Sequence, residues 1–106
     1  MIEISALWTV SPTAQQFVRE RRAEGTLESL AELTSQIFPD ARHLSVDLHE
    51  DPDVANLRWV LIRVEVPWQD AERTRQARDE WYTRTAETLP AAALADFGLE
   101  IDRRPG

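Results

Sequence analysis

The most distinctive segment of this chain is residues 59–66, which read WVLIRVEV and are apolar on both faces of a strand. A strand with one buried face alternates apolar and polar residues, whereas successive apolar residues are typical of a strand in the interior of a sheet. We therefore predict that residues 58–66 form a strand in the middle of a sheet, which ends at Pro67.

Three other segments alternate with the period of two that predicts a strand with one buried face. They cover residues 2–10, 44–48 and 97–101. Residues 50–56, EDPDVAN, have the composition of a turn, which is rich in Asp, Asn and Pro. Strands 44–48 and 58–66 are therefore expected to form an antiparallel hairpin.

Helical spacing dominates the rest of the chain. In residues 12–38 an apolar stripe repeats every three or four positions, after a Ser11-Pro12 pair suited to a helix start. Gly25 is expected to stop a first helix and Thr26 to cap a second, although one broken helix stays possible. A further helix is predicted for residues 68–89, with a connector at 91–95. Its inner stripe would comprise Ala71, Thr74, Ala77, Trp81, Thr85 and Leu89.

The predicted order is strand, helix, strand, strand, helix, strand within one α+β domain of residues 1–106. This order is typical of the ferredoxin-like split β-α-β fold. That fold has a four-stranded antiparallel sheet with strands one and three at its centre. Right-handed crossovers would place both helices on one face. The fold hosts many unrelated functions and so does not decide this one.

Helices on one face would leave the other face of the sheet uncovered. The core face would carry Ile2, Ile4, Trp8, Leu44, Val46, Leu48, Val60, Ile62, Val64, Phe97, Leu99 and Ile101. The uncovered face would carry Glu3, Ser5, Leu7, Ser45, Asp47, His49, Trp59, Leu61, Arg63, Glu65, Gly98, Glu100 and Asp102.

The uncovered face has the composition of a protein interface. Leu7, Trp59, Leu61 and Arg63 would form its contact centre, and the electrostatic rim would comprise Asp47, Glu65 and Glu100. An apolar centre inside a polar rim is the usual anatomy of such interfaces, and Trp is a frequent anchor. Three interpretations stay open: a solvated face, self-association through the sheet, and a different protein partner.

Composition narrows the classes of partner. The net charge is −7 and all twelve basic residues are arginine, so the surface is not the basic one that nucleic acid requires. Without Cys there is no disulfide, thiol nucleophile or thiolate metal site. No apolar run is long enough for a secretory signal or a membrane span. A soluble cytoplasmic protein is expected, with neither nucleic acid nor membrane as partner.

Candidate catalytic residues are few. His43 and His49 are the only side chains suited to proton transfer near neutral pH, and Ser45 lies between them. The polar cluster at residues 49–53 lacks the glycine and distal glutamate of a calcium loop, so a solvated turn is expected. Three glycines cannot build a phosphate-binding loop. We predict no catalytic residue, no metal site and no cofactor.

The run from Phe38-Pro39 through HEDPD to WVLIRVEVP resembles small bacterial proteins that carry an acidic Asp-Pro turn before a hydrophobic strand. The resemblance covers residues 37–67 of the chain. The group has no settled activity, and the resemblance implies a bacterial accessory protein of the kind encoded beside a larger partner.

Two functional interpretations follow from the sequence. The first is a non-enzymatic interaction protein, such as an acidic antitoxin or immunity-type inhibitor, that binds a basic protein or itself. The alternative is an enzyme or small-ligand-binding protein in which two sheets pack face to face as a small dimeric α+β barrel. His43 or His49 would then carry a proton.

Overall fold

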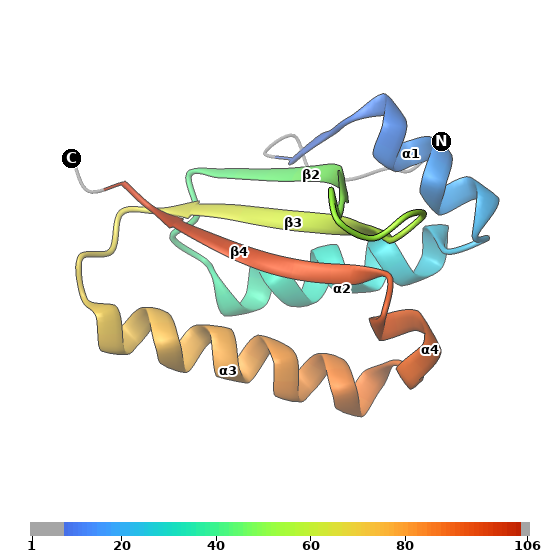
Figure 1. The fold of residues 1–106 in the computed structure, drawn as a ribbon. Coiled ribbons are helices and arrows are strands. Elements are labelled where there is room, and N and C mark those ends of the chain that lie inside the picture. The colour runs from blue at the N-terminus through green and yellow to red at the C-terminus, as the bar shows by residue number, and fades with distance from the viewer. Residues whose placement is uncertain (1–7, 105–106) are drawn as a thin grey trace.

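The computed structural model describes residues 8–104, which form a four-stranded sheet with helices (Figure 1). In chain order the elements are β1 (Trp8–Val10), α1 (Pro12–Glu20), α2 (Glu24–Ile37), β2 (His43–Glu50), β3 (Arg58–Val66), α3 (Ala71–Thr88), α4 (Ala91–Leu94) and β4 (Phe97–Arg103). The long helices α2 and α3 run along one face of the sheet.

The strand order β1-β2-β3-β4 shows that the prediction of a ferredoxin-like fold is wrong. β1 and β2 are parallel, β2 and β3 are antiparallel, and β3 and β4 are parallel, so the sheet is mixed. The element order is β-α-α-β-β-α-α-β. The α+β class is correct, and β3 is a central strand as predicted, but the first strand lies at an edge.

The difference arises from where each crossover returns the chain. In the ferredoxin-like fold each helical connection skips one strand position, whereas here each connection returns the chain beside the strand it left. The hydrophobic pattern of a strand reports which faces are buried and not which strand is its neighbour. Both arrangements therefore fit the same alternation, and the sequence defined only the hairpin of β2 and β3, through the loop of moderate length between them. Their antiparallel pairing confirms that prediction.

Residues 12–38 form two helices, which settles the question of one helix or two. Ser11 caps α1 through its hydroxyl, which accepts from the Ala14 N–H, and Pro12 opens the helix as predicted. The expected stop at Gly25 is wrong, because Gly25 lies inside α2. The break falls at Arg22, whose φ of 54° is left-handed.

The end of α1 is a Schellman motif built without glycine. The Ala23 N–H donates to the Val18 carbonyl at 2.9 Å, and the Arg22 N–H donates to the Arg19 carbonyl at 3.0 Å. These are the two bonds that define the motif. Glycine is the usual residue at the left-handed position, so the sequence pattern pointed to Gly25 rather than to Arg22.

Helix α3 begins at Ala71, three residues later than predicted. Asp70 caps it by accepting from the Glu72 N–H at 2.9 Å. The predicted connector after Pro90 contains the short helix α4. Of the predicted inner stripe, Ala77, Trp81 and Thr85 are buried.

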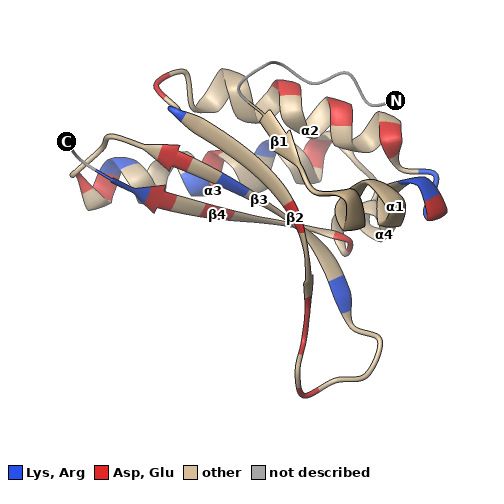
Figure 2. Cartoon of the chain, turned by 90° about the horizontal axis from the view of Figure 1, so that it is seen from above, with Lys and Arg blue, Asp and Glu red and all other residues tan. Residues whose placement is uncertain are grey.

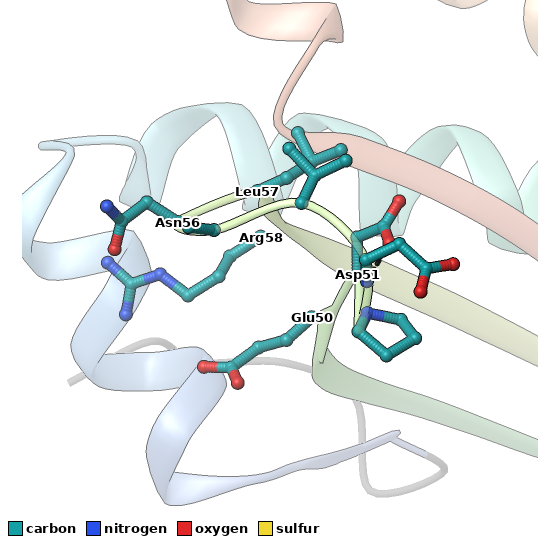
Figure 3. Close-up of a pocket in the computed structure, with 9 residues that line it drawn as sticks. Glu50, Asp51, Asn56, Leu57 and Arg58 are labelled. Carbon is teal, nitrogen blue, oxygen red and sulfur yellow. Dashed lines mark hydrogen bonds between the residues drawn. The ribbon is translucent and has the colours of Figure 1, made fainter.

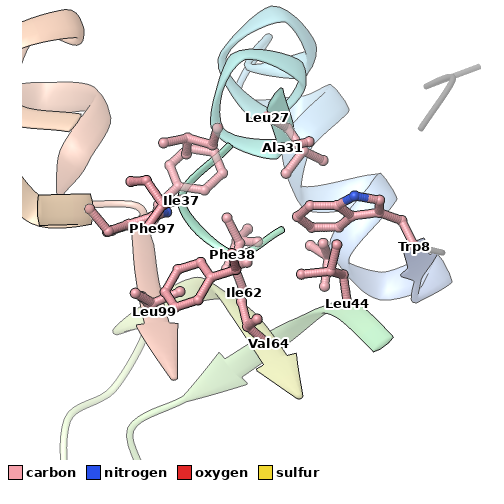
Figure 4. Packing of buried hydrophobic residues seen from close by; sticks show 14 of the residues in the cluster. Trp8, Leu27, Ala31, Ile37, Phe38, Leu44, Ile62, Val64, Phe97 and Leu99 are labelled. Carbon is pink, nitrogen blue, oxygen red and sulfur yellow. The ribbon is translucent and has the colours of Figure 1, made fainter. Parts of the chain in front are cut away.

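The core lies between the sheet and the helices, where apolar side chains of all the strands meet those of α1, α2 and α3 (Figure 4). Predicted core residues that are buried comprise Trp8, Leu44, Val46, Val60, Ile62, Val64, Phe97 and Leu99, and Leu48 and Ile101 pack partly buried against them. Ile2 and Ile4 fall outside the described residues. Because these residues point into the core, the side chains that alternate with them on β2, β3 and β4 point away from the core.

Candidate functional site

The open face is the side of the sheet opposite α2 and α3, and Figure 2 views it directly. Side chains on it alternate with the core residues of each strand. The open face comprises Thr9, His43, Ser45, Asp47, His49, Trp59, Leu61, Arg63, Glu65, Gly98, Glu100 and Asp102. Leu7, predicted as part of the contact centre, lies outside the described residues.

Trp59 and Leu61 form the apolar centre of the open face. Both are half-buried and lie on the central strand β3. Trp59 is opposite His49 in the β2–β3 register, and the two ring centroids are 6.2 Å apart. Leu61 is opposite Asp47 on β2 and opposite Gly98 on β4. The structure thus brings Trp59 and Leu61 of the predicted centre together with Asp47 of the predicted rim.

Gly98 shapes this centre through the side chain that it lacks. A Cβ at this position would lie 3.6 Å from Cδ1 of Trp59 and 3.7 Å from Cδ1 of Leu61. The indole and the leucine therefore extend over the backbone of β4, and no β4 side chain separates them from solvent at this point. The sequence alone predicts that Gly98 lies on this face. Its contacts with Trp59 and Leu61 could not be predicted, because they depend on the register of β3 and β4.

Ion pairs neutralise part of the rim. Arg63 Nε and Nη2 each lie 2.9 Å from Oε2 of Glu100 on the neighbouring strand. Arg104 Nε lies 2.9 Å from Oδ2 of Asp102 and 3.7 Å from Oε1 of Glu65. These pairs are largely exposed, so each contributes little to stability. Arg63 thus pairs with Glu100 on β4, but it also lies near Asp47 on β2, where its charge helps to lower the pKa of that carboxyl group.

Asp47 differs from the other rim carboxylates. Its Oδ1 accepts from the Leu48 N–H at 2.9 Å, at a point where β1 has ended and β2 has no strand partner on that side. The nearby Ser11 hydroxyl is the largest cause of a pKa of Asp47 below its usual value, followed by the hydrogen bond from the Leu48 N–H. Asp47 takes part in no ion pair within residues 8–104, although the nearby charges of His49 and Arg63 also contribute to its lowered pKa.

A hollow of about 140 Å³ lies beside the apolar centre, where β1 passes into α1 over β2. It is lined by Thr9, Ser11, Ser45, Val46, Asp47, His49, Leu61 and Arg63. Leu61 belongs both to the hollow and to the apolar centre. Sequence reasoning missed Thr9 and Ser11 as lining residues, because no local signal reports that α1 begins above β2.

The loop of the β2–β3 hairpin, residues 51–57, extends beyond the sheet and the helices (Figure 2). The residues of this loop line an open hollow of about 630 Å³ together with Glu50 and Arg58, and Figure 3 draws these lining side chains. Asp51 accepts from the Asp53 N–H at 2.8 Å, as in an ordinary Asx turn. Val54 is 50% exposed and Leu57 46% exposed, which makes this loop a second apolar feature that the sequence analysis did not single out.

The candidate catalytic residues share the open face but do not form a catalytic set. His43 and His49 are six positions apart on β2, which separates them by about 20 Å at the rise of a strand. His43 is within hydrogen-bond distance of the Thr9 hydroxyl, at 3.2 Å. Ser45, between the histidines, lies opposite Arg63 in the register. Within residues 8–104, no three His, Asp or Glu side chains are placed to hold a metal ion together.

Comparison with known proteins finds no matching family model, no matching curated protein and no matching solved structure. None of the helices in residues 8–104 combines the length and apolar character needed to cross a membrane.

Proposed function

We propose that this chain is a non-enzymatic interaction module that binds a basic protein through its open face. Trp59 and Leu61 are the contact centre, with Arg63 beside them, and the carboxylates of Asp47, Glu65 and Glu100 are the electrostatic rim. The observation that carries the proposal is the pair Trp59 and Leu61 on a central strand, uncovered by any helix of residues 8–104.

The apolar surface of Trp59 and Leu61 that remains in contact with water costs free energy, which a partner recovers by covering it. Burial of apolar surface stabilises by about 25 cal/mol per Å², so a partner that covers the exposed remainder of the Trp59 indole and the Leu61 side chain gains at most a few kcal/mol. Rigid strands hold both side chains in place, so little entropy is lost when a partner binds. Both features are typical of the small set of residues that dominates a protein interface.

Charge supports a basic partner over a second copy of this chain. The face carries the carboxylates of Asp47, Glu65, Glu100 and Asp102 against the guanidinium groups of Arg63 and Arg104. Two such faces packed together would oppose acidic groups, which disfavours self-association. A basic protein meets the complementary potential, and the net charge of −7 would accelerate their encounter.

An inhibitor of a basic enzyme, of the antitoxin or immunity type, is the class that fits these features. Such a protein needs a rigid, acidic, apolar-centred surface and no catalytic residues of its own. Its size also suits an interface of standard dimensions, about 800 Å² on each partner.

Photo-crosslinking in the host cell tests the proposal. The photoreactive residue p-benzoylphenylalanine replaces Trp59 on the open face or, as a matched aromatic control, Tyr82, which lies on α3 and is 46% exposed. We expect the Trp59 site to form an adduct with one protein of basic isoelectric point, and the Tyr82 site to form none. An adduct only from the Tyr82 site, or an adduct between two copies of this chain, would contradict the proposal.

A further inference from the structure

The hollow beside Leu61 offers a second level of recognition within the open face. Its walls differ in chemistry: the side chain of Leu61 is apolar, His49 carries an imidazole, and Thr9, Ser11 and Ser45 carry hydroxyl groups. Asp47 supplies the negative charge. An apolar wall that leads to a carboxylate and several hydroxyl acceptors suits a long side chain with a cationic, hydrogen-bonding end.

The cation of Arg63 does not prevent this use of the hollow. Both of the Arg63 nitrogens that contact Glu100 lie 2.9 Å from the same carboxylate oxygen, on the β4 side of the residue. Arg63 itself lines the hollow, and its positive charge is compensated by the carboxylate of Glu100. Asp47, which also lines the hollow, forms no ion pair within residues 8–104.

We propose that this hollow receives an arginine side chain of the basic partner, with its stem on Leu61 and its guanidinium group at Asp47. This inference rests on the proposed function and specifies the residue type that the open face reads. The Oδ2 atom of Asp47 and the hydroxyl oxygens of Ser11, Ser45 and Thr9 are the acceptors. Asp47 keeps its bond to the Leu48 N–H throughout.

Arginine fits better than lysine because of the number and spread of the acceptors. A guanidinium group carries five N–H donors in a fixed plane, whereas an ammonium group is a compact, strongly hydrated point charge. The acceptors belong to residues of β1 and β2 and to the N-cap of α1. A planar group can reach several of them at once with less loss of hydration.

The test is a titration of the isotopically labelled full chain, followed by two-dimensional ¹H–¹⁵N NMR, with the peptide acetyl-Gly-Arg-Gly-amide. Peptides with citrulline or lysine in place of arginine serve as ligand controls. The variant D47N removes the charge but retains an oxygen that can accept from Leu48. The matched control E32Q removes a carboxylate from the exposed surface of α2, away from the sheet.

We expect saturable shifts at the amides of Ser11, Asp47, Leu48 and Leu61 with the arginine peptide, and binding at least about tenfold weaker for D47N and for the citrulline peptide. E32Q should bind as the unaltered chain does. Equal binding of the lysine peptide, unchanged binding by D47N, or shifts elsewhere on the surface would overturn the inference.

The two proposals fail separately. If crosslinking from position 59 captures a basic protein while the arginine peptide does not bind at the hollow, the open face remains an interface and only the arginine site is wrong. If the peptide binds at the hollow but position 59 captures nothing, the hollow recognises arginine without the wider interface.

Discussion

Gly98 lies beneath Trp59: a Cβ added to the glycine would lie 3.6 Å from the indole Cδ1. This is ordinary van der Waals contact, so alanine fits at position 98 without displacement of the ring. Alanine also reduces the conformational freedom of the unfolded chain. We expect G98A to raise the free energy of unfolding by about 0.5 kcal/mol. Urea denaturation measures this, and a loss of stability would show that the indole packs more tightly on β4 than described.

Thr34 and Trp81 form a buried hydrogen bond between α2 and α3, in which the indole N–H donates to the threonine hydroxyl at 2.9 Å. T34V would leave that N–H without an acceptor, and we expect a loss of about 1–3 kcal/mol in the free energy of unfolding. T88V is the matched control. The hydroxyls of Thr34 and Thr88 each donate to a carbonyl four residues earlier, that of Leu30 and that of Arg84, but Thr88 is exposed. Equal effects of the two substitutions in thermal or urea unfolding would refute the role of the indole bond.

Arg22 has a φ of 54°, a conformation that glycine adopts without strain. We expect R22G to increase stability by about 0.5–1 kcal/mol, because the left-handed penalty of a residue with a Cβ disappears. The control R19G places glycine inside α1, where it should lower stability by about 1 kcal/mol. Opposite signs for the two arginine substitutions in urea denaturation support the Schellman end of α1; a loss in both contradicts it.

Ser11 both caps α1 and lowers the pKa of Asp47. A carboxyl group with a lowered pKa in the folded state stabilises the fold above its unfolded pKa. This contribution is lost as the pH falls through the folded pKa. We expect S11A to raise the pKa of Asp47 toward its usual value, measured by ¹³C NMR of the carboxyl group. S11A should also lower stability by about 1 kcal/mol through loss of the cap.

The control for this experiment is S29A, which alters an exposed serine of α2. It should change neither the pKa of Asp47 nor the stability by more than about 0.5 kcal/mol. If S11A leaves the Asp47 titration where it was, the Leu48 N–H is the dominant influence and the coupling of α1 to the open face is wrong.

Self-association is also open to a direct test. Because carboxylates outnumber arginines on the open face, we expect sedimentation equilibrium to give a monomer of 12.2 kDa at tens of micromolar protein. A stable dimer that L61D dissociates would show that the face binds a second copy, and would favour the barrel-like arrangement of two sheets over a basic partner.

The sequence was sufficient for the faces of the strands and insufficient for their order. Alternation in residues 44–48 and 97–101, and the doubly apolar run of β3, place Trp59, Leu61 and Asp47 on one face whatever the strand order. The order of the strands is not determined in this way. After a helical crossover, the next strand can lie beside the first strand or one position farther away, and the hydrophobic pattern is the same in both cases. This is why the ferredoxin-like prediction failed while the predicted face was described correctly.

The hollow was beyond sequence reasoning for a related reason. It combines Thr9 and Ser11 with Ser45, Asp47 and Leu61, which become neighbours only when β1 pairs with β2 and α1 begins above it. At Gly25 a local signal gave a wrong prediction. The preference of glycine for helix ends predicted a stop there, but Arg22 takes the left-handed position and Gly25 lies inside α2.

The most direct test of the interface is a calorimetric titration of the captured basic protein into L61D and into the matched variant L57D. Both introduce an aspartate at an incompletely buried leucine, one on the open face and one in the hairpin loop. Provided that both variants unfold cooperatively, L61D should weaken the dissociation constant by at least about 30-fold, and L57D by less than about threefold. Full binding by L61D, or loss of binding only in L57D, would contradict the assignment of the open face.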